Sequence, residues 1–470
     1  MSVFGILYWL SRLIAILAII HVVLDNRQPA KTMAWALVIY FLPIIGVFAY
    51  IFFGINTRRE RMVSRRSMDM LTKRSMLEFV EQRHLQLPEA QRPVIELFAN
   101  QSLALPFNTH KVDVLIDGYQ FFPRLLSDIA HARSHIHIDV YIFEDDALGR
   151  LVSDALIAKA RQGVEVRVIY DDVGCWSVPG RFFERMRVEG IEAEPFMPVR
   201  FPTFARRANY RNHRKLFIVD GRVGYIGGMN IATRYARPSW RDTMMRVEGR
   251  GVYSLQRAFL VDWYFVDRTL LSEKAYYPTV NESQGMSATL LQTVTSGPSS
   301  AYPEIMQGYV RIIMSARSYI YIETPYFLPT AAVLSALKVA ALSGVDVRVL
   351  IPRHSDSRFT QWASRSYLRE ALEAGIHVGL YEAAFLHSKL MVCDDAVCTC
   401  GSTNLDFRSF ENNFEANLFV YDPAVARRLK DVYLADEQLS SSLAAQPDFV
   451  RPHFMARLWE SVTRLFSPLL

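Results

Sequence analysis

One sequence pattern occurs twice in the chain, and it restricts the possible folds more than any other feature. Asn212–Asp220 and Leu386–Asp394 both contain His-x-Lys-x-x-x-x-Asp, with the histidines at positions 213 and 387. In each copy an apolar run follows the lysine, which predicts a buried strand. Histidine and lysine are two positions apart, so they point to the same face of that strand. The repeat predicts a fold built from two similar halves.

The surrounding sequence repeats with the pattern. Gly163–Val168 reads Gly-Val-Glu-Val-Arg-Val, and Gly344–Val349 reads Gly-Val-Asp-Val-Arg-Val at a similar distance before the second motif. From Val112 onward, short apolar stretches typical of strands alternate with stretches of helical periodicity. These observations predict an α/β fold with two tandem repeats, at residues 107–285 and 286–470.

Polar residues follow both copies of the pattern at matching distances. Asn230 and Asn404 each lie the same distance after the histidine of their own copy. A carboxylate follows further on in both copies, Asp242 in the first and Glu415 in the second, with spacings that differ by one position. Histidine can attack phosphorus or move a proton, and lysine and asparagine can bind phosphoryl oxygens, so the set suits a phosphate ester. A single histidine and lysine at this spacing would more often be two exposed residues on a strand. Two copies, each followed by an asparagine and a carboxylate, indicate a functional site.

The segment at positions 1–57 predicts a membrane hairpin. Met33–Phe53 contains no charged residue over 21 positions and is long enough to cross a bilayer. Residues 3–24 form a second apolar stretch, interrupted by Arg12. An arginine at the centre of a helix raises the free energy of inserting that helix into the membrane by roughly 2.5–3.5 kcal/mol. We expect both stretches to span the membrane; a buried helix of a soluble domain is the alternative for the stretch at 33–53.

Basic residues follow the hairpin, in a segment at 58–106 that we expect to be a juxtamembrane linker. Seven arginines and lysines and two acidic residues lie between positions 58 and 74, whereas the hairpin loop contains two basic residues. Positive residues concentrate on the cytoplasmic side of membrane proteins, so we expect the long C-terminal part in the cytoplasm. The basic run could also bind anionic headgroups.

Charge and composition narrow the possible partners and cofactors. The formal net charge of +6 suits an anionic partner, either nucleic acid or anionic lipid. The four cysteines lack the spacing of two ligand pairs, so we expect free thiols and no zinc. The chain has no Gly-x-x-x-x-Gly-Lys phosphate loop and no evident carboxylate cluster for paired magnesium ions. We therefore expect no cofactor and no metal.

The paired motif resembles that of the phospholipase D superfamily, and nearly the whole chain resembles bacterial cardiolipin synthases. The segments that carry the closer resemblance are Leu42–Gly46, Asn209–Lys215, Trp240–Asp242, Ser296–Pro298, Thr324–Phe327, Asn404–Phe410 and Ser467–Leu470. The resemblance implies two phospholipase D-like repeats that share one active site behind two transmembrane helices. It also implies a multi-pass protein of the bacterial inner membrane that joins two phosphatidylglycerols into cardiolipin and glycerol.

The resemblance assigns roles to the residues of both copies. One histidine would be the nucleophile and the other the general acid and base. The expected catalytic residues are His213, Lys215, Asp220, His387, Lys389 and Asp394, the two aspartates chiefly as structural residues at the strand ends. The expected phosphate-binding residues are Asn230, Asn404 and Ser402, and the residues expected to orient the imidazoles are Asp242 and Glu415.

Several alternatives stay open at this point. Hydrolysis of phospholipids by a membrane-bound phospholipase D is the main rival, and a phospholipase D-like nuclease is a weaker one because of the hairpin. A binding protein with an inactive site fits poorly with two complete motifs. We expect His213 to be the nucleophile, because Arg211 and Arg214 beside it would lower its pKa and keep it neutral. The resemblance also implies that the histidine of the first motif attacks. The amphipathic C-terminus, Phe454–Leu470, is either an interfacial helix or a helix packed on the domain.

Overall fold

The computed structural model describes residues 3–24, 29–54, 85, 87–102, 104–199, 210–271, 273–279, 289–446, 449 and 452–469. The basic run at 58–74 and most of the expected linker between the repeats lie outside these residues. The chain divides into two compact units. One comprises Met1–Arg61 and Val199–Tyr210, and the other comprises Met62–Pro198 and Arg211–Leu470.

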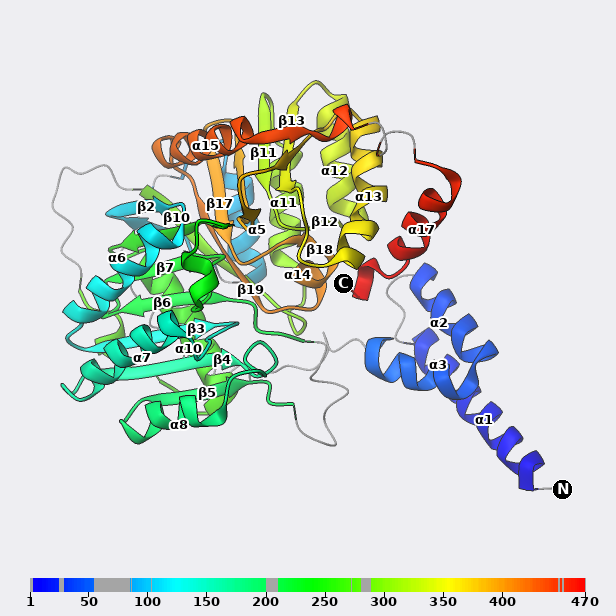
Figure 1. Ribbon diagram of the computed structural model, residues 1–470, viewed down its shortest axis with the longest axis horizontal. Coiled ribbons are helices and arrows are strands. Elements are labelled where there is room, and N and C mark those ends of the chain that lie inside the picture. The colour runs from blue at the N-terminus through cyan, green and yellow to red at the C-terminus, as the bar shows by residue number, and fades with distance from the viewer. Residues whose placement is uncertain are drawn as a thin grey trace. The chain divides into compact units, whose positions relative to one another are not determined.

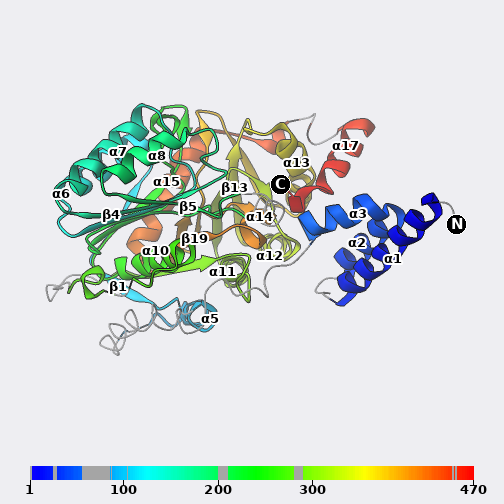
Figure 2. The same cartoon turned by 90° about the horizontal axis from the view of Figure 1, so that it is seen from below.

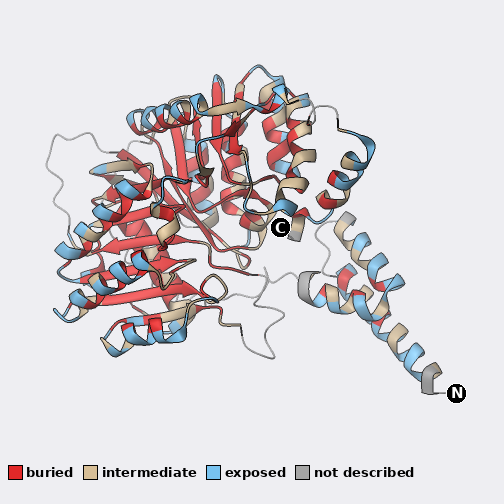
Figure 3. Cartoon of the chain, in the orientation of Figure 1, coloured by how far each residue is buried: buried red, intermediate tan, exposed pale blue. Residues whose placement is uncertain are grey.

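The N-terminal unit is a small cluster of apolar helices. Its elements are α1 (Val3–Leu24), α2 (Pro29–Phe41), α3 (Pro43–Ala49) and the π-helical turn η1 (Tyr50–Gly54). Gly5–Leu24 in α1 is long and apolar enough to cross a membrane, and it is the one such helix in the described part of the chain. Most large apolar side chains of α1 are exposed (Figure 3), as lipid contact would require.

The stretch at 33–53, expected to span the membrane, is not one continuous helix, because the helix breaks at Leu42. Leu42 has φ −126° and ψ 69°, and Pro43 begins the next helix. Proline lacks an amide hydrogen and disfavours helical backbone at the residue before it. The piece before the break has 13 residues, and the piece after it has 7 residues in α3 followed directly by 5 in η1. Each piece is shorter than the roughly 20 residues that a straight span needs.

Arg12 has a partner near this break. Its guanidinium donates to the carbonyl of Tyr40, at 2.9 Å, and lies over the rings of Tyr8 and Tyr40. The last carbonyls of a helix lack intrahelical donors, so a nearby arginine can satisfy one of them. The arginine that weakens residues 3–24 as a span is thus hydrogen-bonded within the helical cluster.

The first repeat contains a seven-stranded sheet in the order β2-β9-β7-β6-β3-β4-β5 (Figure 1). The strands are β2 (Lys111–Leu115), β3 (His135–Val140), β4 (Glu165–Asp171), β5 (Glu192–Phe196), β6 (Lys215–Val219), β7 (Val223–Gly227) and β9 (Met244–Glu248). The helices are α6 (Gly118–His131), α7 (Ala147–Ala160), α8 (Gly180–Val188) and α10 (Val252–Asp267). Strands β3, β4 and β5 are parallel, whereas the motif strand β6 runs antiparallel to β3.

The second repeat contains a nine-stranded sheet in the order β1-β10-β19-β17-β16-β11-β13-β14-β20. Its strands are β1 (Phe107–Thr109), β10 (Thr289–Ser296), β11 (Tyr319–Glu323), β13 (Asp346–Pro352), β14 (His377–Tyr381), β16 (Leu390–Cys393), β17 (Val397–Gly401), β19 (Glu415–Val420) and β20 (Ser440–Ser442). Its helices are α5 (Arg92–Ser102), α11 (Glu304–Ile313), α12 (Ala331–Leu342), α13 (Arg358–Glu373), α14 (Phe407–Glu411), α15 (Pro423–Gln438) and α17 (Phe454–Arg464). The motif strand β16 lies antiparallel to β11, as β6 does to β3.

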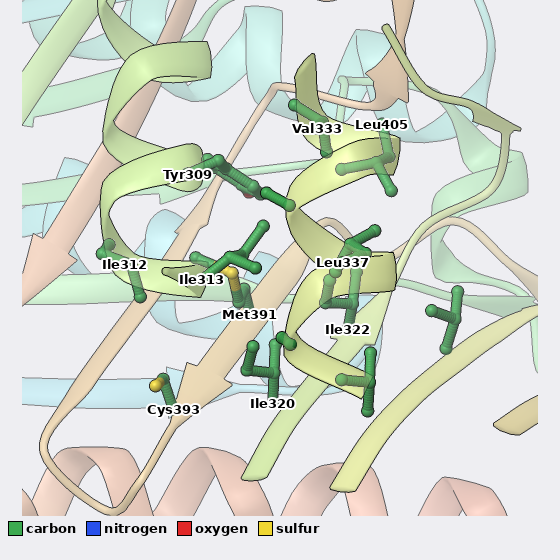
Figure 4. Packing of buried hydrophobic residues seen from close by; sticks show 14 of the residues in the cluster. Tyr309, Ile312, Ile313, Ile320, Ile322, Val333, Leu337, Met391, Cys393 and Leu405 are labelled. Atoms are coloured by element: carbon green, nitrogen blue, oxygen red, sulfur yellow. The ribbon is translucent and has the colours of Figure 1, made fainter. Parts of the chain in front are cut away.

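Each repeat has its own hydrophobic core on its sheet. In the second, Ile320 and Ile322 of β11 and Met391 of β16 face the apolar sides of α11 and α12 (Figure 4). Helices α10 and α15 contact strands of both repeats, so the two halves pack into one unit, as the view in Figure 2 also shows. This arrangement brings the two motifs within reach of each other.

The boundary between linker and repeats differs from the expected one. Residues 58–106 were expected to be a linker, but α5 packs Val94, Ile95 and Phe98 into the core of the second repeat. Strand β1 pairs with β10 of that repeat, so the first sheet begins at Lys111 and not at residue 107. Sequence periodicity can predict the helix, but it carries no information on which repeat the helix covers.

The aspartates that end the two motifs lie at the strand ends, and both have left-handed backbone. Asp220 (φ 54°) accepts hydrogen bonds from the amides of three consecutive residues, 133–135, at 2.7–3.2 Å. Asp394 (φ 53°) accepts from the amides of residues 317–319 at 2.7–2.9 Å. Each aspartate thus ties the end of its motif strand to the start of the neighbouring strand.

Replacing Asp220 with Ala is expected to destabilise the fold without acting on the chemistry. The substitution removes hydrogen bonds to a charged group and places alanine at positive φ, so we expect the free energy of unfolding to fall by about 3 kcal/mol. Thermal unfolding of the purified protein measures this. Asp220→Asn is the matched control, because asparagine tolerates left-handed backbone and keeps one acceptor. Normal stability with lost turnover would instead place Asp220 in the reaction.

Candidate active site

The two motifs meet at the junction of the repeats through backbone pairing. Two short parallel strands, β8 (Trp240–Arg241) and β15 (Phe385–Leu386), join the repeats there. The amide of His387 donates to the carbonyl of Arg241 at 2.7 Å, and the amide of His213 donates to that of Phe414 at 2.9 Å. Each motif histidine is therefore bonded to the residue just before the carboxylate of the other repeat.

The carboxylates cross over between the repeats. Nδ1 of His213 lies 3.0 Å from a carboxylate oxygen of Glu415, and Nδ1 of His387 lies 2.7 Å from Asp242. Both acids are fully buried. Neither repeat alone therefore contains a complete pair of imidazole and carboxylate. Because Nδ1 is engaged in both histidines, Nε2 is the ring nitrogen available for chemistry.

The motif lysines are buried beside the imidazoles. The ammonium of Lys215 donates to the carbonyl of His213, and that of Lys389 to the carbonyl of His387. Burial lowers the pKa of Lys215 to about 7 and that of Lys389 to about 8, although the nearby carboxylates oppose it. An anion bound here would favour the charged form of both lysines.

Burial also lowers the pKa of both motif histidines. For His387 the pKa falls to about 3, with Lys389 as a further cause and Asp242 opposing. The pKa of His213 falls despite Glu415, and the lysines of both motifs contribute. The charges of the two motifs thus act on one site, where the imidazoles are neutral when no anion is bound.

For the two carboxylates, Asp242 and Glu415, neighbouring cations outweigh the effect of burial on the pKa. Burial alone would raise the pKa of Asp242, but Lys389 and His387 outweigh it and lower the pKa. The same holds for Glu415, whose pKa is lowered by His213, Lys215 and the hydroxyl of Ser402. Ionised carboxylates accept the Nδ1 hydrogen and so fix the tautomer of each imidazole.

The expected phosphate-binding residues are already engaged to different degrees. The hydroxyl of Ser402 donates to the carboxylate of Glu415, so its hydrogen is already engaged there. The amide of Asn230 accepts from the backbone of Ile142 and donates to the hydroxyl of Tyr235, at 3.0 and 2.6 Å. Oδ1 of Asn404 is buried without a hydrogen-bond partner among the described residues.

Two arginines next to the motifs were not assigned a supporting role from the sequence. Arg214 donates to the backbone carbonyl of Glu415 at 3.1 Å and pairs with the buried Asp262 of α10. Arg241 donates to the carbonyl of Asp242 at 2.9 Å and pairs with Asp436 of α15 at 2.7 Å. In the sequence, only their positions next to His213 and Asp242 pointed to a supporting role for Arg214 and Arg241. Each arginine holds the backbone of an imidazole-orienting residue.

The electrostatic reason for expecting His213 to be the nucleophile is wrong, so that expectation rests on the resemblance of the first motif alone. The guanidinium groups of Arg211 and Arg214 pair with the buried aspartates Asp171 and Asp262. The cationic groups that lower the pKa of His213 are the motif lysines Lys215 and Lys389. The flanking arginines therefore do not distinguish the two histidines electrostatically.

Aromatic rings surround both imidazoles unequally. Tyr141 lies 5.2 Å from His213, between ring centroids. His387 has three aromatic neighbours at 5.1–6.1 Å, namely Trp240, Phe385 and Tyr235.

Among the described residues, no three His, Cys, Asp or Glu side chains are grouped as metal ligands would be.

Comparisons with known proteins agree on one family. The family described as "Cardiolipin synthase, PLD-like domain" matches residues 125–263 and 309–436, and "Phospholipase_D-nuclease N-terminal" matches residues 13–54. The chain is 38% identical to the major cardiolipin synthase ClsA of Bacillus subtilis, over 100% of both chains. It is also 38% identical to the cardiolipin synthase of Oceanobacillus iheyensis, over 97% of this chain and 96% of that one.

A solved structure supports the fold. The chain is similar to the phosphatidylserine synthase of Haemophilus influenzae, with a TM-score of 0.62 and 15% identity. The similarity covers 82% of this chain and 100% of that one. At this identity the likeness concerns the fold alone.

Proposed function

Because the chain belongs to the cardiolipin synthase family of phospholipase D-like proteins, we propose that it is a phosphatidyltransferase that converts two phosphatidylglycerols into cardiolipin and glycerol. The observation that carries the proposal is the crossed pairing of His213 with Glu415 and of His387 with Asp242. It places two oriented imidazoles and two buried lysines in one site, as a two-step displacement at phosphorus requires.

The first step forms a phosphatidyl-histidine. Nε2 of His213 attacks the phosphorus of one phosphatidylglycerol, and the bond from phosphorus to the headgroup glycerol breaks. His387 gives a proton to the departing glycerol oxygen. The negative phosphodiester raises the pKa of His387 from its low value in the empty site, so that it can carry this proton.

The second step transfers the phosphatidyl group. A hydroxyl of the second phosphatidylglycerol loses its proton to His387 and attacks phosphorus, and the bond to His213 breaks. Lys215, Lys389, Asn230 and Asn404 would hold the phosphoryl oxygens. One phosphodiester replaces another, so the reaction needs no nucleotide.

Purified protein in mixed micelles with phosphatidylglycerol is expected to form cardiolipin and release an equal amount of glycerol. Thin-layer analysis of labelled lipid and an assay of free glycerol measure the two products. A chelator and the absence of nucleotide should leave the rate unchanged. Phosphatidic acid as the main product across detergent conditions would identify a hydrolase and contradict the proposal.

We propose that the protein crosses the inner membrane twice, with the catalytic part in the cytoplasm. The basic residues at 58–74 favour this orientation. A reporter fused after Leu470 is expected to be active only as a cytoplasmic reporter. For the number of crossings, Ser2→Cys can be labelled with a membrane-impermeant maleimide, because the four native cysteines are buried. Labelling only after the inner membrane is opened supports two crossings, whereas labelling from the periplasm means that α1 alone spans.

A further inference from the structure

Helix α17 docks on the second repeat with its polar side. Glu460 is fully buried, and its carboxylate binds Arg365 and Arg369 of α13, both at 2.7 Å. One turn later, Arg464 pairs with Glu370 of α13 at 3.0 Å. Thr463 is also fully buried. The helix packs on the domain, as one of the two sequence alternatives expected, but its charged side chains form the contact.

The apolar side of α17 faces away from the domain. Its large side chains are exposed, namely Phe454 (76%), Met455 (65%), Leu458 (46%) and Trp459 (50%), and so is Leu465 (77%) directly after the helix. Phe466 is half-exposed, and its ring contacts that of Phe359 of α13, at 5.8 Å between centroids. A surface helix of a globular protein normally has the reverse orientation, with the apolar stripe toward the core. Figure 3 shows the exposed outer side of α17 in pale blue. An exposed apolar stripe of this size indicates an interaction surface.

The charged residues of α17 indicate which kind of surface its exposed side would contact. Glu460 is the one acidic residue between positions 452 and 469, and it is buried, whereas Arg457 is exposed. The exposed surface of α17 is therefore apolar and aromatic, with the cationic Arg457 and no acidic side chain, which suits a helix in the headgroup region of an anionic bilayer. In addition, α1 gives the same chain a segment suited to a membrane, so a bilayer is available to the domain.

We propose that α17 is a membrane-docking helix that inserts Phe454, Leu458, Trp459 and Leu465 into the surface of an anionic bilayer, while Glu460 holds it to α13. Such a contact would be a second attachment beside the N-terminal hairpin and would fix the domain on the lipid surface. The proposal rests on the membrane segment and on the side chains of α17. It does not rest on the proposed reaction.

Full-length Leu458→Cys carrying an environment-sensitive fluorophore tests this contact. The native cysteines are buried, so the label is selective. In vesicles of phosphatidylglycerol and phosphatidylcholine in equal parts, we expect a blue-shifted emission that brominated acyl chains quench at least twofold. In vesicles of phosphatidylcholine alone, the quenching should be weaker. The control is Val188→Cys on α8, which is 77% exposed and should keep an aqueous, unquenched emission.

Each other outcome overturns the proposal. An aqueous emission at residue 458 in anionic vesicles would mean that α17 stays in water. A blue-shifted emission without quenching would mean that a protein surface, such as a second copy, covers the helix. Equal quenching in both kinds of vesicle would mean that α17 does not require anionic lipid, which contradicts the proposal. Turnover measured in micelles, where no bilayer is present, reports separately on the proposed reaction.

Discussion

Labelled phosphatidylglycerol is expected to leave its phosphatidyl group on His213 in the His387→Asn variant, and on no residue in the His213→Asn variant. Without His387 the departing glycerol lacks its acid and the second phosphatidylglycerol lacks its base, so the intermediate forms slowly and then persists. In the proposed reaction His213 is the nucleophile, so its loss prevents the intermediate from forming. Peptide mapping after rapid denaturation locates the label, in mild base because phosphohistidines are labile to acid.

Turnover alone does not separate the two histidines. Both substitutions are expected to lower it by roughly 1,000-fold or more, because general acid–base and nucleophilic groups each contribute on that scale. The location of the label is the decisive measurement. Label on His387 in the His213→Asn variant, and none in the His387→Asn variant, would reverse the two roles.

The sequence predicted which residues form the site better than it predicted which of them contact one another. The motif strands, the α/β repeats and the residues Asp242 and Glu415 were all recognisable from spacing. Each acid follows the histidine of its own repeat at nearly the same distance, but this spacing does not say which imidazole each acid contacts. The structure pairs each acid with the other repeat, because His213 and His387 are hydrogen-bonded by backbone across the junction. Contacts of this kind depend on how two sheets pack, which local periodicity does not encode.

The same limit explains the other differences. The apolar pattern predicted α17 as an amphipathic helix, but its polar side binds α13 through Glu460, so amphipathicity did not indicate which side is buried. The uncharged stretch at 33–53 has the length of a span, yet Pro43 divides it. In both cases the apolar composition is as predicted, but the arrangement depends on backbone geometry or on a partner helix.

The crossed carboxylates make a prediction that neither motif makes by itself. Asp242→Asn and Glu415→Gln are each expected to lower turnover by roughly 100- to 10,000-fold, because an amide can favour the wrong imidazole tautomer and does not stabilise the imidazolium. Asp242 raises the pKa of His387, so its loss lowers that pKa further. The remaining activity of Asp242→Asn should therefore peak at a lower pH than that of the natural protein. Asp220→Asn, which neutralises an acid away from the imidazoles, should keep its turnover.

The trapping experiment then tests the crossing itself. If Asp242 acts through His387, Asp242→Asn should behave like a weakened His387 variant and accumulate label on His213. If Glu415 acts through His213, Glu415→Gln should form little label at all, although His387 is intact. The opposite pattern, with label lost in Asp242→Asn and retained in Glu415→Gln, would mean that each acid serves the histidine of its own repeat. Thermal unfolding of each variant reports general damage to the fold separately, so a loss of label is interpreted only for a variant that unfolds at the same temperature as the natural protein.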